Sequence, residues 1–529
     1  MAKESAVNLA EPPPESPAER ESSVGSWHDR GAVVLCLVML VIASGYASAH
    51  QIGTLGVETD FYGSYEPHAR RILRGLPFTY RLNPPGYMIL LAGVSLLTGG
   101  DFFLAGKILS VIASVVVVGL SYLIARALAG PAVALATALL SLIAIIPFSF
   151  IAATDLVGAA AILAAIWMII RPTRRLIFSA AAAGALAGMA FLIRQNAIFL
   201  VAGGVICLLF LDPWSSSRRA RLTGVAALVG GWLLLAAPWL VWNARHYGGP
   251  LSGRAHEQVA AHFFSPMGDA YGAVSQQMGL RFQSMSDVVR HDPVRVAKQY
   301  TRDVVLNYPR LLMQGLVRFP AYIFLGAGAV LLLLDLTRRR VAFALLCLLG
   351  YGLLGLVGYY TRLHLFLTPA LFLPVAYFLF HPSVTGVMAR TGLRRNSISW
   401  LLCAGIALLA GYTAFSLADQ ELADEPRHLI RAAEWLRLRA EPGDHIVSTK
   451  PHLSAFTGLG YSYSFASTPT ALVDDLRRHR IRFLHVSDID RGLPPYSELT
   501  DTTRAPDGLT LVYRDPSPLT LIYEVRGAR

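Results

Sequence analysis

The residues whose types and spacing could do chemistry are concentrated between positions 58 and 87. Two carboxylates, Glu58 and Asp60, lie two residues apart. They precede a helix expected from Pro67 to Gly75, because proline suits a first helical turn and glycine commonly follows a helix end. A carboxylate in such a loop can act as a general base toward a hydroxyl group. A solvated loop acid or a helix cap is the alternative, and the residue types alone leave both open.

The elements that must position this segment are apolar. Of 529 residues, 54% are hydrophobic and 15% charged, against roughly 25% charged in a soluble domain. Runs long enough to cross roughly 30 Å of hydrocarbon predict an α-helical polytopic membrane protein with about eleven transmembrane helices. These runs are residues 32–49, 105–128, 131–149, 156–170, 177–192, 197–211, 224–242, 321–336, 342–358, 363–379 and 398–415. Residues 86–97 are apolar but short, and we expect an interfacial helix there.

Clusters of arginine predict how the chain crosses the membrane. If the N-terminus is cytoplasmic, five groups fall inside: Arg126, Arg171/Arg174/Arg175, Arg218/Arg219/Arg221, Arg338/Arg339/Arg340 and Arg390/Arg394/Arg395. The short connections on the other face carry only Arg194 and Arg362, as the positive-inside rule requires. The same placement explains the net charge of +12 without a nucleic-acid partner, since no basic groove with interleaved aromatic residues is apparent. An odd number of spans puts the C-terminus outside the cytoplasm.

Three regions follow from this topology. Residues 1–30 are rich in Pro, Glu and Ser and predict a disordered cytoplasmic tail. Residues 31–417 form the membrane domain, with large outer loops at about 50–104 and 245–320. Residues 418–529 predict an extracytoplasmic α/β domain, with helices at 425–440 and 469–479 and strands at 445–449, 482–486, 509–513 and 519–525.

The few ionisable residues of the apolar runs are predicted at the outer membrane face. They are Lys107, Asp155, Arg194 and Arg362, each at the extracytoplasmic end of its helix. Ion-coupled transporters usually place such groups near the bilayer midplane. The observed distribution favours chemistry at the outer interface over passage through the bilayer, although each cation could instead be a snorkelling anchor.

Four stretches together carry a family resemblance. The run from Asp60 through Gly75 to NPPGY at 83–87 resembles the first outer loop of the GT-C superfamily of membrane glycosyltransferases. Three further stretches fit that superfamily: FLIRQN at 191–196, APWLVWNARHYG at 237–248, and YYTRLH at 359–364, followed by Pro369. The resemblance is nearest to the protein mannosyltransferases and the lipid A aminoarabinose transferases (glycosyltransferase family 39-like) and covers about residues 32–417. One departure is that many relatives have an acidic pair at the loop acid, whereas Asp60 is followed by Phe61.

The resemblance implies transfer of a hexose or pentose from a polyprenyl-phosphate carrier to an acceptor hydroxyl at the outer face, with inversion. Phosphate departs as an anion without a general acid, so one base suffices, unlike the two carboxylates of a glycoside hydrolase. We expect Asp60 to be that base. We expect Arg194, Arg362 and Lys107 to bind the donor phosphate. Supporting roles are hypothesised for Glu58, His68, Tyr360, His364, Lys450 and His452, with His364 hydrogen-bonding Arg362.

The expected partners are a polyprenyl-phosphate sugar, an acceptor that is a lipid, glycan or protein, and membrane lipids. No cofactor or metal is expected, although the Glu58-x-Asp60 pair could imitate the paired acids with which some GT-C enzymes hold a divalent ion. Two other functions fit the same layout. One is a carrier or flippase for lipid-linked sugars, and the other is a noncatalytic subunit of an envelope-assembly complex.

Overall fold

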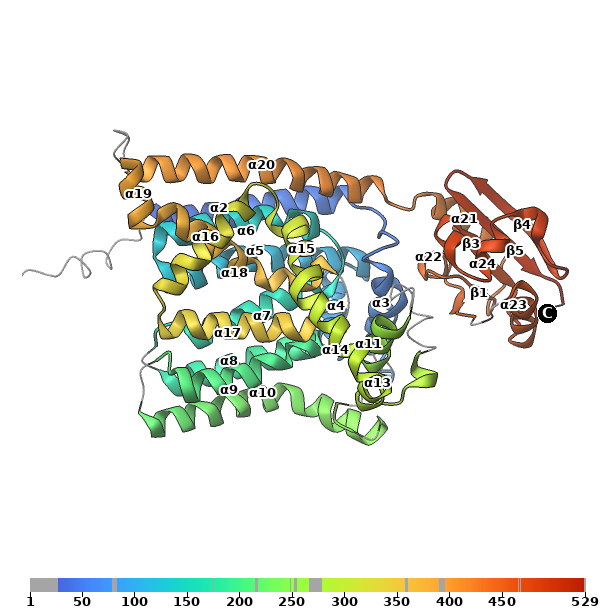
Figure 1. The fold of residues 1–529 in the computed structure, drawn as a ribbon. Coiled ribbons are helices and arrows are strands. Elements are labelled where there is room, and N and C mark those ends of the chain that lie inside the picture. The colour runs from blue at the N-terminus through green and yellow to red at the C-terminus, as the bar shows by residue number, and fades with distance from the viewer. Residues whose placement is uncertain are drawn as a thin grey trace, which may run out of the picture.

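A helical bundle and a small α/β unit at one of its ends make up the computed structural model (Figure 1). The structure describes residues 27–527 except 79–82, 174, 215–216, 248, 252–254, 266–277, 357–359, 390–394, 465 and 467. The predicted tail therefore lies outside the described residues up to position 26, and residues 27–30 are already helical. Arg174, Arg390, Arg394 and the first tyrosine of the 359–364 motif also lie outside them.

All eleven predicted apolar runs contain helices of one bundle, which lie side by side along a common axis (Figure 1). Seven of the described helices are long and apolar enough to cross a membrane, or eight if Pro293–Val317 and Ala321–Leu334, bent by 115°, form one span. The count of eleven stays a prediction. The helices are α2 (Trp27–Ala49), α5 (Phe102–Ala129), α6 (Pro131–Ile145), α7 (Thr154–Ile170), α8 (Leu176–Ile193), α9 (Phe199–Ile206), α10 (Arg218–Tyr247), α16 (Ala321–Leu334), α17 (Arg338–Leu354), α18 (Thr368–Phe380) and α20 (Arg395–Ala423).

Small residues let α8 and α10 pack backbone against backbone. Gly184 and Gly188 form a G-x-x-x-G pattern on α8, the spacing that brings apolar helices into close approach. Gly184 lies against the carbonyl of Leu228, and Gly188 lies against the carbonyl of Trp232 on α10. A Cβ at Gly184 would overlap that carbonyl, so the glycine is required by the packing.

The arginine clusters that are described gather at the end of the bundle opposite the α/β unit. Arg340 donates to the carbonyl of Leu128 at 3.0 Å, Arg339 to that of Pro213 at 3.3 Å, and Trp214 to that of Arg171 at 3.1 Å. Arg194 and Arg362 lie at the other end, beside the first outer loop. The charge asymmetry predicted from the sequence is present in space, and the orientation across a membrane stays a prediction.

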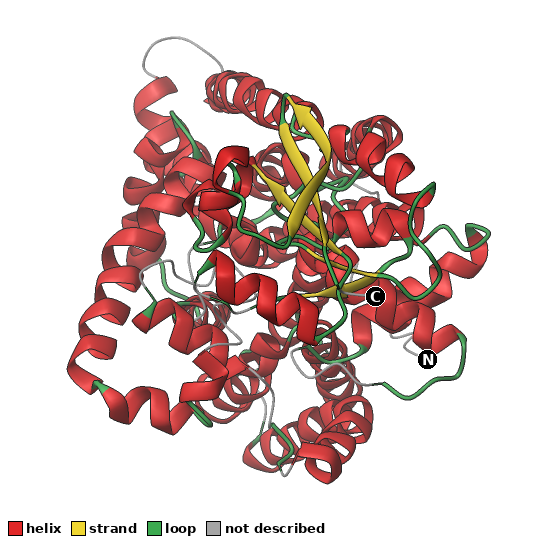
Figure 2. Cartoon of the chain, turned by 90° about the vertical axis from the view of Figure 1, so that its right-hand side faces the viewer, coloured by secondary structure: helices red, strands yellow, loops and turns green. Residues whose placement is uncertain are grey.

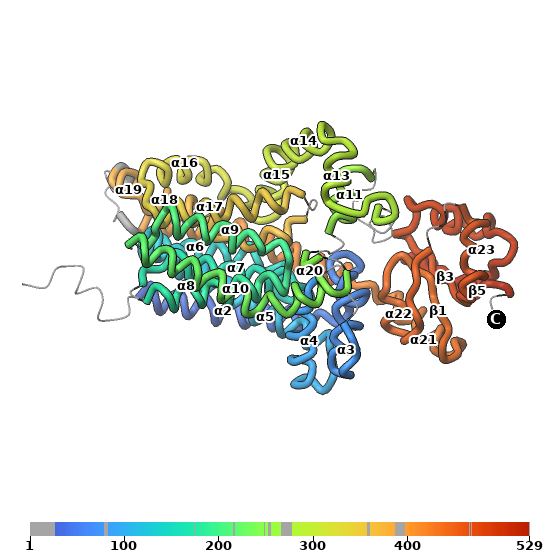
Figure 3. The backbone as a smooth tube through the Cα atoms, turned by 90° about the horizontal axis from the view of Figure 1, so that it is seen from below, coloured from blue at the N-terminus to red at the C-terminus, as the bar shows by residue number. Residues whose placement is uncertain are grey.

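Short helices of the two long loops cover the end of the bundle that faces the α/β unit, on opposite sides (Figure 3). The first loop forms η1 (Phe61–Tyr65), α3 (Glu66–Leu73) and α4 (Gly86–Leu97). The helix predicted from Pro67 begins one residue earlier, and Gly75 follows it with φ of 66°. The second loop forms α11 (Ala255–Phe264), α13 (Met285–His291), α14 (Pro293–Arg302), η5 (Asp303–Asn307), α15 (Tyr308–Leu312) and η6 (Met313–Val317).

The α/β unit is a five-stranded sheet in the order β2-β1-β3-β5-β4. In Figure 2 its yellow strands lie in front of the bundle, which is viewed along its axis. Its strands are β1 (His445–Val447), β2 (Gly460–Ser462), β3 (Phe483–Ser487), β4 (Leu509–Pro516) and β5 (Leu519–Val525). Strand β1 is parallel to β2 and β3, and β5 is antiparallel to β3 and β4. The helices are α21 (His428–Arg437), α22 (His452–Thr457), α23 (Pro469–Arg478) and α24 (Tyr496–Leu499). The four predicted strands and both predicted helices are present, whereas the three-residue strand β2 and the short helices α22 and α24 were not predicted.

Candidate functional site

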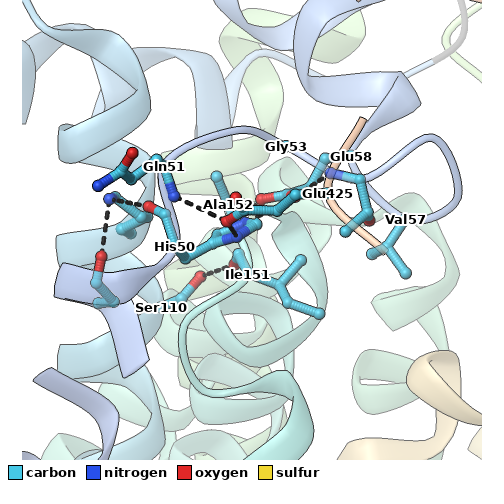
Figure 4. Close-up of polar contacts among 12 residues, drawn as sticks. His50, Gln51, Gly53, Val57, Glu58, Ser110, Ile151, Ala152 and Glu425 are labelled. Carbon is cyan, nitrogen blue, oxygen red and sulfur yellow. Dashed lines mark hydrogen bonds and ion pairs between the residues drawn. The ribbon is translucent and has the colours of Figure 1, made fainter. Parts of the chain in front are cut away.

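Glu58 is fully buried and fixes the backbone of the first outer loop (Figure 4). One carboxylate oxygen accepts from the backbone N–H of Ala152, in the connection between α6 and α7, at 2.7 Å. The other accepts from the N–H of Thr54 at 2.7 Å and lies 2.9 Å from Nε2 of His50. Glu58 therefore supports the segment carrying Asp60, and its oxygens are directed into the protein.

His50 joins this loop to the segment that follows α20. Its Nδ1 lies 3.0 Å from Glu425, which also accepts from the N–H of Gln51 at 2.8 Å (Figure 4). Burial disfavours a charged imidazole, but the carboxylates of Glu58 and Glu425 outweigh that effect and raise the pKa of His50. The imidazole of His50 bridges two buried carboxylates and thereby joins the loop to the segment that leads into the α/β unit.

Asp60 immediately precedes η1 and has an exposed side chain. Its carboxylate is close enough to act electrostatically on Tyr65 in the same loop and on Arg362 before α18. It also acts on Lys450 and Tyr463 in the α/β unit. Arg362 additionally donates to the carbonyl of Val57 at 3.0 Å, three residues before Asp60. The structure thus brings Arg362 within electrostatic reach of Asp60, which lies 302 residues earlier in the chain.

Asp155 connects the two predicted phosphate-binding arginines. Its carboxylate lies 2.7 Å from Arg194 and 3.8 Å from Arg362. Arg194 also donates to Thr154 Oγ1 at 2.9 Å. Asp155 is in the first turn of α7, where the helix N-terminus favours a negative charge. Asp155 was predicted at this membrane face but without a role in the site, and the rarity of acids in apolar helices was the signal that pointed to it.

Tyr65 is a second residue that the sequence analysis missed. Its buried hydroxyl bonds Thr154 and lies within the electrostatic reach of Asp60 and Arg194. Burial raises the pKa of Tyr65, so the hydroxyl stays neutral. The ring packs against Tyr87 with centroids 5.0 Å apart. A tyrosine followed by a helix carries no sequence signal that separates a contact with the charged groups of the site from ordinary packing.

Lys107 and His68 serve local structure. The ammonium of Lys107 donates to the carbonyl of Ala47 at 2.7 Å and to that of His50 at 2.5 Å. It thereby satisfies carbonyls at the C-terminal end of α2, which lack partners within that helix. Nδ1 of His68 lies 2.7 Å from the carbonyl of Ser64. We therefore leave Lys107 out of the proposed phosphate site, in contrast to the expectation from sequence.

Tyr360 and His364 shape the turn that carries Arg362. The guanidinium of Arg362 lies 5.3 Å from the ring centroid of Tyr360. Nδ1 of His364 lies 3.1 Å from the carbonyl of Tyr360, and the imidazole ring packs against Tyr308 and Tyr351. The hydrogen bond expected between His364 and Arg362 is replaced by this contact with the backbone. His364 therefore fixes the conformation of the turn, and the turn positions Arg362.

Lys450 and His452 bring the α/β unit to the loop. Burial lowers the pKa of Lys450, and the nearby Asp60 carboxylate opposes that effect. His452 is fully buried, and its Nε2 lies 3.1 Å from the carbonyl of Thr54. Its ring lies 4.8 Å from that of Tyr62, and burial lowers its pKa to about 3. His452 is thus a neutral docking contact, and Lys450 is a cation of this unit that lies within electrostatic reach of Asp60.

The same geometry bears on whether Glu58 and Asp60 could hold a metal ion. Within the described residues no three His, Cys, Asp or Glu side chains gather as a metal-binding group. The oxygens of Glu58 are engaged by Thr54, Ala152 and His50, so Glu58 and Asp60 do not form a paired-acid ligand set. Independence from a metal or cofactor stays a prediction.

Comparison with known proteins gives one family match and several structures of similar fold. Residues 83–242 match the family model of dolichyl-phosphate-mannose-protein mannosyltransferases. No curated protein matches the chain in sequence. The structure resembles the apo form of the oligosaccharyltransferase of Archaeoglobus fulgidus, with a TM-score of 0.59 and 13% identity over 89% of this chain and 70% of that chain.

Two structures with bound lipid phosphates are also similar. ArnT from Cupriavidus metallidurans bound to undecaprenyl phosphate has a TM-score of 0.58 and 14% identity, over 96% of this chain and 99% of that chain. The archaeal oligosaccharyltransferase AglB from Archaeoglobus fulgidus, in complex with an inhibitory peptide and a dolichol-phosphate, has a TM-score of 0.56 and 12% identity. The similarity covers 94% of this chain and 74% of that chain. The match over residues 83–242 and the shared fold support the resemblance to the GT-C superfamily that the sequence motifs predicted.

Proposed function

We propose that this protein transfers a sugar from a polyprenyl-phosphate carrier to an acceptor hydroxyl at the extracytoplasmic membrane face, with inversion. The observation that supports the proposal most strongly is that Arg362 donates to the carbonyl of Val57, three residues before Asp60, and lies within electrostatic reach of the Asp60 carboxylate. Asp155 links Arg362 to Arg194 at the same place. One carboxylate and two cations are the groups that this reaction needs.

In the proposed reaction the acceptor oxygen attacks the anomeric carbon as the bond from that carbon to the phosphate oxygen breaks. Asp60 accepts the hydroxyl proton, and the bonding electrons leave with the phosphate. Since lipid phosphate is a stable anion, a protonating acid is not needed. The exposed side chain of Asp60 is accessible to an acceptor.

The two arginines would bind the donor phosphate and stabilise its growing charge. A guanidinium presents planar paired donors that match phosphate oxygens. Contacts with Val57 and Asp155 hold Arg362, and contacts with Thr154 and Asp155 hold Arg194. Because both side chains are preorganised, little reorganisation is needed as charge develops on the leaving group.

Two features support a lipid-linked donor and an outer-face acceptor. ArnT and AglB, which share the fold, were solved with undecaprenyl phosphate and dolichol-phosphate. The arginine asymmetry supports a cytoplasmic N-terminus and an extracytoplasmic α/β unit in a multi-pass protein of the cell membrane. Lys450 and Tyr463 of that unit lie within electrostatic reach of Asp60. We propose that a lipid, glycan or protein acceptor binds between the α/β unit and the loop that carries Asp60.

The decisive experiment incubates purified protein with a panel of polyprenyl-phosphate sugars and acceptors and measures released lipid phosphate. Asp60→Asn should lower turnover about 10²- to 10⁴-fold, the usual contribution of a general base, while Glu434→Gln, an exposed acid on α21, should match the wild type. Full turnover by Asp60→Asn, or sugar-lipid moved across the membrane without phosphate release, would exclude the mechanism and favour a carrier. Absence of turnover together with loss of envelope assembly on removal of residues 418–529 would favour the noncatalytic subunit.

A further inference from the structure

An open groove of about 750 Å³ lies on the flank of the bundle, outside the site described above. It forms where the chain turns between η6 and α16, a bend of 115°. The opposite wall is α20. The groove is lined mainly by Arg310, Gln314, Arg318, Tyr322, Leu409 and Tyr412.

Arg318 is buried in the wall of this groove with 4% of its surface exposed. Nε and both terminal nitrogens of its guanidinium have no hydrogen-bond partner in the part of the chain that the structure describes. Its backbone N–H bonds the carbonyl of Met313 at 2.8 Å, so the main chain is fixed and the side chain alone is unsatisfied. A buried guanidinium keeps its charge and is costly without an anion. Among the described residues, Arg318 therefore has no anionic partner.

The walls around Arg318 indicate what carries that anion. Large apolar side chains border the groove and point outward, including Tyr412 at 81% and Leu409 at 55% exposure on α20 and Tyr322 at 43% on α16. Both helices belong to the set expected in contact with lipid. A free anion would gain nothing from these walls, whereas an anion on an acyl tail satisfies the cation and covers the apolar surface.

We propose that Arg318 binds the phosphate head group of a membrane lipid whose tails lie along α16 and α20. Gly315, three residues before Arg318, packs against Thr361, the neighbour of Arg362. The lipid site and the turn that carries Arg362 thus share η6 but use different faces of it. This proposal stands whether or not the protein transfers a sugar.

The test measures binding to the full-length protein in detergent by native mass spectrometry. The three probes are a short-chain phosphatidic acid, a diacylglycerol with the same tails, and inorganic phosphate. We expect phosphatidic acid to bind at least tenfold more tightly than either of the others. Equal binding of inorganic phosphate would show a site for free anions, and equal binding of diacylglycerol would show a purely apolar groove; either result overturns the proposal.

Variants locate the site. Arg318→Gln should weaken phosphatidic acid binding roughly tenfold or more, since it removes a charge-assisted contact, and Arg318→Lys should weaken it less. Tyr412→Ala removes a wall residue whose exposure makes it dispensable for folding, and should also weaken binding. The control is Arg290→Gln, an exposed arginine on α13 outside the groove, with unchanged binding. If Arg318→Gln fails to fold, the affinity of Tyr412→Ala for phosphatidic acid tests the proposal instead. Wild-type affinity in that variant would contradict it.

Discussion

Replacement of Asp155 by asparagine removes the carboxylate that connects Arg194 and Arg362 while keeping the size of the side chain. The side chain of Asp155 is 5% exposed, and those of the two arginines are 18% and 17% exposed. Solvent therefore screens these charges weakly. In the variant, two nearly buried guanidinium groups face each other across a neutral amide, so both the stability of the fold and the placement of the arginines should suffer.

The size of the effect follows from this burial. Breaking a buried ion pair by removing one partner costs about 3–5 kcal/mol. Asparagine can still accept one hydrogen bond from Arg194, so we expect the lower end, about 3 kcal/mol, in the free energy of unfolding. For the reaction, loss of one charge-assisted contact to each arginine should lower kcat/KM for the lipid donor about 10- to 100-fold.

Thermal unfolding in detergent and released lipid phosphate would be measured on the same preparations. The matched control is Glu66→Gln, which breaks the exposed i,i+4 pair with Arg70 on α3; such pairs contribute about 0.3–0.5 kcal/mol. If Asp155→Asn unfolds at the wild-type temperature and keeps kcat/KM within twofold, Asp155 does not organise the arginines and our description of the site is incorrect.

Three further predictions test separate parts of the structure. Lys107→Met should lower the unfolding temperature, because it removes two hydrogen bonds to the end of α2, but it should leave KM for the donor unchanged. A raised KM would instead indicate that Lys107 binds the donor phosphate. Gly184→Ala should destabilise the bundle by about 1–3 kcal/mol through overpacking against α10, whereas Gly405→Ala, with open space around it, should not. Burial lowers the pKa of His452 to about 3, so between pH 7 and 5 the unfolded chain gains a proton that the folded chain does not. Stability should then fall by about 2 kcal/mol, and a thermal-unfolding series in which His452→Gln shows the same acid loss as wild type would count against this assignment.

The periodicity and length of apolar runs determined the helical part of the fold from sequence. Residues 86–97 show this well, because the helix α4 has the predicted bounds. The strands at 483–487, 509–516 and 519–525 were predictable for the same reason, since their alternation and β-branched content are local properties. Strand β2 was missed, because the three residues Gly460, Tyr461 and Ser462 are too few to show an alternating pattern.

The site depended on contacts that no local pattern contains. The importance of charge at one membrane face was visible in sequence, and so were Asp60, Arg194 and Arg362. Only the tertiary structure decided that Asp155 joins the arginines, that Glu58 supports the loop, and that Lys107 satisfies α2. Each of these assignments depends on which donors and acceptors meet across helices far apart in the chain. Residue type and spacing specify the secondary structure, whereas the partner of a buried charge is specified only by the packing that removes it from water.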